Sequence, residues 1–169
     1  MEDARFGSSN TRILKFSLQM LRKLMILSLL STLFGCGGDG KPGIFSDNGY
    51  HVGKEKVWYK SSTGMSYSVR EVFGADAQSF AKRELSSKIY KGATAYYGFD
   101  NNSVFWADAK IEGADLPSFE YLCNQYSRDK NAVYYMAQQL TKDVAHLEIV
   151  SWDFIKDSAH VYFGSEVFS

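Results

Sequence analysis

Hydrophobic residues recur along the chain in short triplets that are separated by polar, turn-forming residues. Val or Ala followed by two aromatic residues occurs five times, beginning at Val57, Ala95, Val104, Val133 and Val161. Such triplets favour β-strands, and alternation along a strand directs the middle ring to one face and its neighbours to the other. Asp, Asn and Ser separate the apolar runs, as in RDKNAVYY (residues 128–135), and these side chains favour tight turns. The pattern therefore predicts a series of β-hairpins.

A second motif alternates with the hairpins. GADAQSF (residues 74–80) and GADLPSF (residues 113–119) are close copies, and TKDVAHL (residues 141–147) is a degenerate one. Gly ends the preceding strand, Asp76 or Asp115 is placed to cap a helical turn, and Phe80, Phe119 or Leu147 is placed to anchor it. The last three triplets begin 29 and 28 residues apart, a period typical of stacked repeats. The sequence predicts a mainly β (β-rich α+β) domain of stacked β-hairpin repeats joined by short helical turns.

The combination of these motifs resembles the DKNYY family, repeat proteins found mostly as predicted bacterial lipoproteins. The residues that match its signature directly are Asp129, Lys130, Asn131, Val133, Tyr134 and Tyr135. The resemblance covers roughly residues 90–168, and more weakly the chain from Val57. The last repeat departs from it, because Ser158 and Ala159 stand where Lys and Asn are expected. The resemblance implies no particular biochemical activity.

The N-terminal third has the features of a secretory signal. An eleven-residue apolar run, LMILSLLSTLF (residues 24–34), follows Arg22 and Lys23 and is too short to span a bilayer. The run ends in LFGC, which resembles a lipobox with Cys36 as the acylated residue. The alternative is an ordinary cleaved signal in which Cys36 is incidental. The nineteen residues before Met20 exceed a usual n-region, so we expect residues 1–35 to combine a signal peptide with an N-terminal extension and translation to start at Met20.

Composition suggests a division of the remaining chain. Residues 36–49 are rich in Gly, Asp and Ser, which predicts a flexible tether after the lipidated cysteine. Residues 50–169 have a suitable length for a single repeat domain. We expect a membrane partner through the lipid anchor, on the periplasmic face of the outer membrane or at the cell surface. The chain has 19 acidic and 19 basic residues, and the basic residues do not form a stripe. This argues against nucleic acid as a partner.

Signatures of catalysis are missing from the sequence. It contains no G-x-S-x-G, H-E-x-x-H, phosphate-binding glycine loop or C-x-x-C motif. The histidines His51, His146 and His160 are far apart, and we interpret them as surface or structural residues. No catalytic residue, metal site or cofactor is predicted.

Two residue types leave alternatives open. The repeated Asp100, Asp129 and Asp157 could together bind Ca²⁺, but turn formation explains them without the dense spacing of a calcium loop. Cys123, within the apolar stretch FEYLCNQY, is interpreted as buried; the alternative is a reactive thiol.

The aromatic rows are the best candidate for a binding surface. If the strands stack in register, one face presents a row made of Trp58, Tyr96, Phe105, Tyr134 and Tyr162. The opposite face presents Tyr59, Tyr97, Trp106, Tyr135 and Phe163. One face must form the core, and the other could be an aromatic platform for a glycan or an envelope protein unless the helical turns cover it. The first row is the candidate platform, with exposure expected toward Trp58 and Tyr96.

These features together predict a cell-envelope lipoprotein that acts as a non-enzymatic binding module. Two alternatives remain: a hydrolase of envelope polymers with a dispersed site, and an immunity or inhibitor lipoprotein that binds a partner protein. A cleft with convergent acid–acid or Ser–His groups would favour the hydrolase. An open aromatic face without such groups would favour binding.

Overall fold

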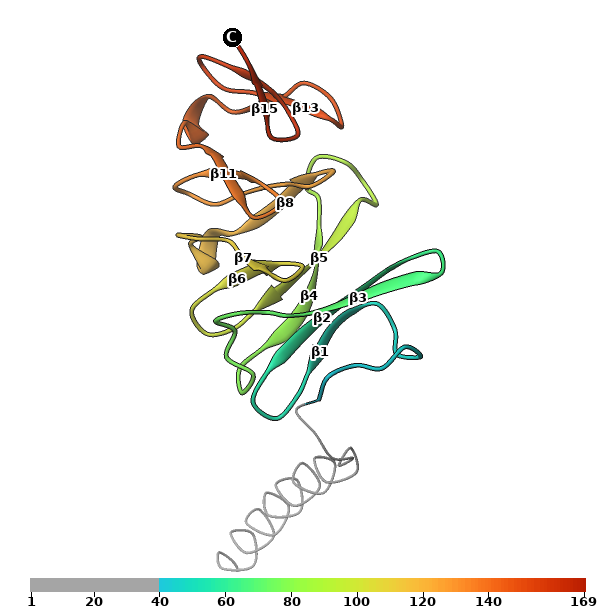
Figure 1. The fold of residues 1–169 in the computed structure, drawn as a ribbon. Coiled ribbons are helices and arrows are strands. Elements are labelled where there is room, and N and C mark those ends of the chain that lie inside the picture. The colour runs from blue at the N-terminus through green and yellow to red at the C-terminus, as the bar shows by residue number, and fades with distance from the viewer. Residues whose placement is uncertain (1–39) are drawn as a thin grey trace, which may run out of the picture. The chain divides into compact units, whose positions relative to one another are not determined.

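The computed structural model describes residues 40–169, which form four small antiparallel sheets. Each sheet is a meander, because strands that are consecutive in the chain are hydrogen-bonded neighbours. We call the segments that form these sheets units 1 to 4, in chain order, and Figure 1 shows them in succession from β1 to β15. The mainly β fold with short helical connections confirms the predicted class.

The strands are short, as expected for hairpin repeats. Unit 1 contains β1 (Gly49–Val52), β2 (Val57–Thr63) and β3 (Ser66–Glu71). Unit 2 contains β4 (Ala81–Ser86), β5 (Thr94–Phe99), β6 (Val104–Trp106) and β7 (Ala109–Lys110). Unit 3 contains β8 (Glu120–Cys123), β9 (Tyr126–Arg128), β10 (Val133–Tyr135) and β11 (Gln138–Thr141). Unit 4 contains β12 (Glu148–Ile149), β13 (Phe154–Lys156), β14 (Val161–Phe163) and β15 (Glu166–Phe168).

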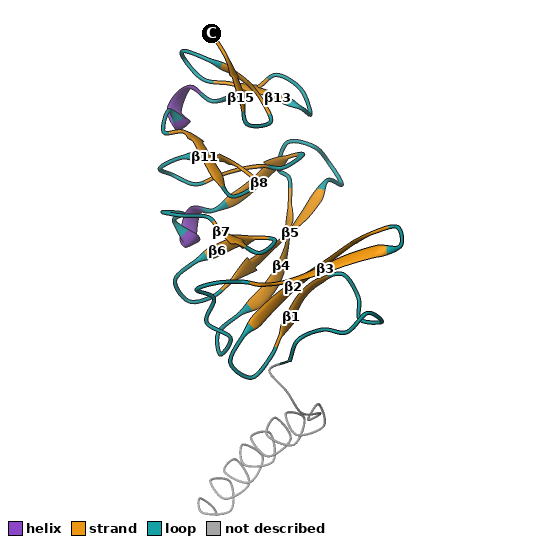
Figure 2. Ribbon diagram, in the orientation of Figure 1, coloured by secondary structure: helices purple, strands orange, loops and turns teal. Residues whose placement is uncertain are grey.

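Two 3₁₀-helices connect the later units. They are η1 (Leu116–Ser118), between units 2 and 3, and η2 (Val144–His146), between units 3 and 4 (Figure 2). Asp115 is the N-cap of η1, and its side chain accepts a hydrogen bond from the Ser118 N–H, as the GADLPSF motif predicts. Asp143 caps η2 without such a bond to the helix backbone.

The pairing register aligns the repeats. Val133 pairs with Arg128 and Val161 with Lys156, each next to a turn that begins with Asp129 or Asp157. Val104 pairs with Phe99 before the Asp100 turn in the same way. We call the strand pairs β1–β2, β5–β6, β9–β10 and β13–β14 the central hairpins of the units.

One triplet lies on the other strand of its hairpin from the remaining four. Ala95, Tyr96 and Tyr97 lie on β5, the first strand of a central hairpin, and not on the return strand that the other four triplets occupy. On β5, Tyr97 is fully buried and packs 5.2 Å from the Trp106 ring, whereas Tyr96 is 52% exposed with the Lys82 Nζ 4.9 Å from its ring. A triplet of strand-forming residues does not specify which strand of the hairpin it enters. The pairing of the strands determines that position.

The hydrophobic core lies between units, not within them. The cluster that joins units 1 and 2 contains the buried residues Val57, Val72 and Phe105. The cluster that joins units 2 and 3 contains Tyr97, Phe99, Val104, Ile111, Tyr121 and Tyr134. The cluster that joins units 3 and 4 contains Leu122, Cys123, Tyr126, Val133, Ile155 and Tyr162. Each small sheet therefore depends on its neighbours for burial, as in other repeat arrays.

The first sheet has a polar cover on the face turned away from unit 2. The Lys60 ammonium, in a side chain that is almost fully buried, donates to the backbone oxygens of Ile44 and Ser46. Lys41 places its Nζ 5.4 Å from the centre of the Trp58 ring. Residues 41–46, part of the segment expected to be a tether, thus contact β2. Cys36 and residues 1–35 lie outside the described residues, and no helix in the described part has the length and apolar character to cross a bilayer.

Candidate functional site

The aspartate that opens the central turn in units 2, 3 and 4 organises the turn backbone. Asp129 Oδ1 accepts hydrogen bonds from the N–H groups of Asn131 and Ala132, at 2.7 and 2.8 Å. Asp100 and Asp157 accept the equivalent pairs of bonds, at 2.7–2.9 Å. These bonds are those of turn-forming Asp side chains. No group of three or more His, Cys, Asp or Glu side chains within residues 40–169 is arranged to hold a metal ion.

The second oxygen of the same aspartate joins one unit to the next. Asp129 Oδ2 accepts the N–H of Asp115, from the connection that follows unit 2, at 2.6 Å, and the Tyr134 hydroxyl at 3.0 Å. Asp100 Oδ2 likewise accepts the N–H of Asp76, which follows unit 1, at 3.0 Å. The signature aspartate and the GAD motif are therefore two halves of one contact between neighbouring units.

A serine completes this contact. The Ser118 hydroxyl donates to Asp115 Oδ2 at 2.6 Å and accepts the N–H of Lys130 at 3.1 Å. Ser79 makes the same two bonds, to Asp76 and from Asn101, at the junction between units 1 and 2. The Lys130 Nζ lies 2.8 Å from Asp115 Oδ1, and its hydrogen bond to that carboxylate is the first cause of a pKa of Asp115 below the usual value.

The junction between units 3 and 4 departs from this arrangement, as the sequence of the last repeat does. Ser158 replaces Lys130 and donates both its hydroxyl and its N–H to Asp143. Burial acts to raise the pKa of Asp157, but the hydrogen bonds from Ala159, Tyr162, Thr141 and His160 outweigh it, so the pKa lies below its ordinary range.

The row expected to form a platform is mostly buried. Phe105, Tyr134, Tyr162 and Trp58 have between none and 8% of their surface exposed, and only Tyr96 is open to solvent. In the triplets on β6, β10 and β14, the middle ring points toward the preceding unit. In the triplet on β2 of unit 1, it points toward the polar cover. This row therefore fills the junctions, and the partly exposed aromatic surface belongs to the other row.

The other row lies beside a repeated cross-strand contact. Each central hairpin holds a pair of aromatic rings with centroids 4.9–5.2 Å apart, namely Tyr50–Tyr59, Tyr97–Trp106, Tyr126–Tyr135 and Phe154–Phe163. The second member of each pair is the last residue of a triplet, and in units 2, 3 and 4 it directly precedes the turn that leads to the following strand. These second members are partly exposed, and Phe163 is exposed.

A groove with a volume of about 430 Å³ runs along these turns across units 2, 3 and 4. Trp106 and Tyr135 supply its aromatic walls, and Asp108, Gln138 and Ser165 supply polar groups. The turns have matching left-handed residues, Ala107 (φ 51°), Met136 (φ 54°) and Gly164 (φ 62°), which bring the chain back directly after each aromatic side chain. The sequence signal that could have identified this groove is the similar short turn after VFW, VYY and VYF.

Within residues 40–169, one Asp–His–Ser group was compared with a serine-hydrolase triad, and its geometry does not match. Asp143 Oδ1 lies 2.7 Å from His146 Nδ1, and its other oxygen accepts the Ser158 hydroxyl. In a serine relay the imidazole must lie between the carboxylate and the hydroxyl, whereas here the carboxylate lies between the other two groups. This cluster joins η2 to the last central turn.

Cys123 is buried, as interpreted from the sequence. Its side chain has no exposed surface, and burial, with a smaller effect of Asp153, raises the pKa of its thiol to about 11. A thiol with such a pKa is almost entirely protonated near neutral pH and is a poor nucleophile. Cys123 is thus part of the core between units 3 and 4.

Comparison with known families identifies one match. The model of the DKNYY family matches residues 50–169, which include all four units except Gly49. Neither the curated proteins nor the solved structures provide a match. The match spans more than half of the chain, and it includes Asp129 and Lys130, which bond to the connection that follows unit 2. The chain belongs to the DKNYY family.

Proposed function

We propose that this protein is a cell-envelope lipoprotein that acts as a non-enzymatic binding module, with its ligand held along the groove beside Trp106 and Tyr135. The observation that supports this most is the pair of partly exposed aromatic rings in one groove. A volume of about 430 Å³ is within the range of small-ligand pockets, roughly 300–1,000 Å³.

The chemistry of the groove favours a glycan. Aromatic faces stack on the apolar faces of sugar rings, and Asp108, Gln138 and Ser165 offer hydrogen-bonding groups for hydroxyls. The groove crosses three units, so it suits an extended chain of sugars better than a single compact ligand. Fragments of peptidoglycan are the envelope polymer to test first.

Fluorescence titration tests the binding site. We expect soluble peptidoglycan fragments to shift the tryptophan emission of the full chain, and Trp106→Ala to abolish both the shift and the binding measured by calorimetry. Tyr135→Ala should weaken binding while Trp106 still reports it. Trp152→Phe is the matched control, because Trp152 packs against Tyr90 and does not line the groove. Absence of binding by the wild type, or binding that survives both groove substitutions, would refute the proposal.

The lipid anchor is a separate part of the proposal. It rests on Arg22, Lys23, the apolar run and Cys36, and it includes sorting to the outer membrane. Labelling with a palmitate analogue should mark the wild type and the Cys123→Ser control, whereas Cys36→Ser should lose the label and the membrane association. Labelling that persists in Cys36→Ser would show that Cys36 is not the site.

A further inference from the structure

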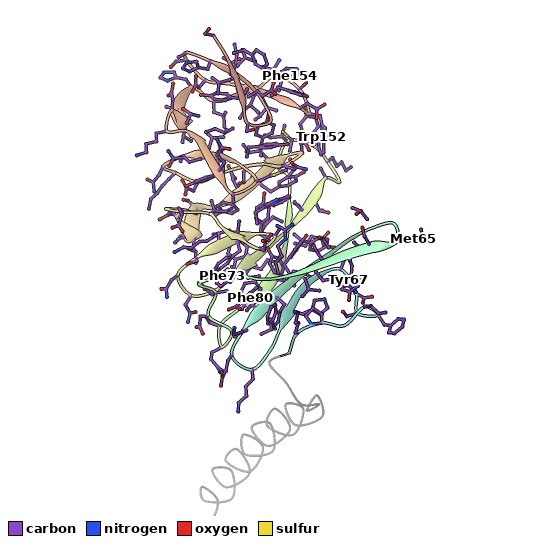
Figure 3. The ribbon with its side chains drawn as sticks, viewed as in Figure 1. Met65, Tyr67, Phe73, Phe80, Trp152 and Phe154 are labelled. Carbon is purple, nitrogen blue, oxygen red and sulfur yellow. The ribbon has the colours of Figure 1, made fainter. Side chains whose placement is uncertain are left out.

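Two turns beside the first sheet carry large apolar side chains where turns usually carry polar ones. In the first turn, the N–H and the hydroxyl of Ser46 donate to the backbone oxygen of Gly43, at 3.3 and 2.6 Å. Ile44 and Phe45 lie between these two residues. In the second turn, Met65 lies at the tip of the β2–β3 hairpin (Figure 3). Phe45 is 97% exposed and Met65 is fully exposed, so neither side chain stabilises the fold by packing in its core.

The two turns lie on either side of one hollow in the surface, with a volume of about 460 Å³. The ammonium of Lys60 joins its two sides, because it donates to the backbone oxygen of Ile44 at 2.9 Å and lies 5.4 Å from the centre of the Tyr67 ring. Ile44 and Tyr67 are themselves about half exposed. We call the surface formed by these four apolar side chains the apolar patch of unit 1; its members are Ile44, Phe45, Met65 and Tyr67.

The apolar patch is only a few residues from the proposed lipid anchor. Residues 41–46 contact β2 and so belong to the folded domain. Lys41 follows Cys36 by five residues, and a fully extended chain of that length spans at most about 18 Å. Whatever path the residues between them take, a lipid on Cys36 would hold this side of the first sheet next to the bilayer surface.

We infer that the apolar patch of unit 1 inserts into the headgroup region of the bilayer that holds the anchor. This inference rests on the proposed lipidation of Cys36. Exposed apolar side chains leave water when they enter the boundary between headgroups and acyl chains, and Tyr is enriched at that depth. The other residues that line the hollow are mostly polar, such as Asn48 and Ser62, and suit the headgroups around the inserted side chains.

The anchor makes a weak contact of this kind sufficient. A domain that is already confined to the surface meets the bilayer at a high effective concentration, so the apolar patch need not bind membranes alone. The insertion would fix the orientation of the domain on the bilayer. None of the patch residues lines the groove beside Trp106, so membrane docking and ligand binding use different residues.

Fluorescence quenching by labelled lipids tests this inference. The full chain, purified as the lipidated protein, is reconstituted in vesicles of phosphatidylethanolamine and phosphatidylglycerol after Met65→Cys or Val167→Cys is labelled with an environment-sensitive fluorophore. Cys123 is buried and the lipid occupies Cys36, so the label reports a single position. Insertion to a depth of roughly 5–10 Å should shift the emission at position 65 to the blue and make its quenching by spin-labelled phospholipids about twofold stronger, or more, than at position 167. Val167 is the matched position, because it is 54% exposed and lies in unit 4.

Substitutions in the other turn show whether the whole patch is involved. Ile44→Ser combined with Phe45→Ser should remove most of the blue shift and of the quenching at position 65. Phe73→Ser is the control, because Phe73 is 75% exposed and does not line the hollow, and it should leave both signals unchanged. Thermal unfolding of each variant shows that it is folded.

Three outcomes would overturn the inference. A blue shift at position 65 without quenching would mean that protein, not lipid, covers the apolar patch. Equal quenching at positions 65 and 167, or signals that survive the double substitution, would mean that the patch does not insert. Palmitate labelling of the same preparation separates these results from failure of the anchor: a chain without lipid at Cys36 refutes the anchor and this inference together, whereas a lipidated chain without quenching at position 65 refutes this inference alone.

Discussion

Units 3 and 4 have the same four-stranded meander and similar sequences, yet their side chains are buried to very different extents. The triplet Val133–Tyr135 is in the core with its last ring partly exposed, whereas in Val161–Phe163 only the middle ring is buried. The turn aspartates Asp129 and Asp157 bond their turns in the same manner. The local structure is therefore independent of position in the array, but burial is not.

The reason is that a unit supplies only half of each core cluster. Tyr126 of unit 3 is buried by residues of unit 4, and the equivalent Phe154 has no following unit within the described residues. Stability in such arrays is approximately a sum of weak units and the contacts between neighbours. Equivalent substitutions in units 3 and 4 should therefore have unequal effects.

The largest difference is expected at the first aromatic residue of the central hairpin. Tyr126→Ala should lower the free energy of unfolding by about 3–5 kcal/mol, the usual effect of truncating a buried aromatic residue. Phe154→Ala should lower it by about 1 kcal/mol, chiefly through loss of the ring contact with Phe163. Urea unfolding at low protein concentration measures both values. Equal losses would mean that units 3 and 4 do not differ in burial.

A smaller difference is expected at the turn aspartate. Asp129→Ala leaves the buried N–H of Ala132 and the buried Tyr134 hydroxyl without their acceptor, and should destabilise by about 2–4 kcal/mol. Asp157→Ala should cost about 1–2 kcal/mol, because the N–H of the exposed His160 can bond to water. Asp100→Ala is the internal control and should resemble Asp129→Ala in urea unfolding. A larger effect at Asp157 would contradict the comparison.

The local elements of this fold could be predicted from sequence because their causes are local. The triplets at Val104, Val133 and Val161 became return strands, and Asp115 became the cap of a short helix. Strand β4 (Ala81–Ser86) was not predicted: its residues are mostly exposed and lack an apolar alternation, so only its pairing with β5 defines it.

The exposed surface could not be predicted, because exposure depends on how the units stack. The sequence shows that one aromatic row must be buried, but not which one. The buried row is that of Phe105 and Tyr134, since it points to the preceding unit, and the groove therefore formed beside Trp106 and Tyr135. The sequence also does not show that the aspartates act both in the turn and in the junction between units. That second role is visible only in the contact between Asp129 and Asp115, which are far apart in the chain.

Acid sensitivity sharpens the comparison further. The pKa of Asp157 is lowered in the folded state, so this carboxylate contributes stability above the unfolded-state pKa of about 4, and the contribution is lost as the pH falls below that value. We expect the melting temperature of the wild type to fall between pH 5 and pH 3, and Asp157→Asn to remove part of that fall while lowering stability at neutral pH. Identical pH profiles for the two proteins would show that Asp157 is not linked to unfolding.

The smallest effect is expected in an experiment that keeps the core residues between units 3 and 4 unchanged and follows the exposure of Cys123 as urea is added. In a full-length Cys36→Ser chain, Cys123 is the only thiol, and it lies fully buried in the cluster with Ile155 and Tyr162. Because burial raises the pKa of this thiol to about 11, a thiol reagent at neutral pH should react only when unit 4 detaches. Weakly held parts of a structure open first, so labelling should begin at a lower urea concentration than the loss of Trp58 fluorescence in unit 1. The fluorescence is measured in a chain with Trp106→Phe and Trp152→Phe, in which Trp58 is the remaining tryptophan. Tyr162→Ala should shift labelling to still lower urea, whereas Val57→Ala, in the core between units 1 and 2, should leave the onset of labelling unchanged. Labelling that coincides with the fluorescence change in every variant would mean that all the units unfold together.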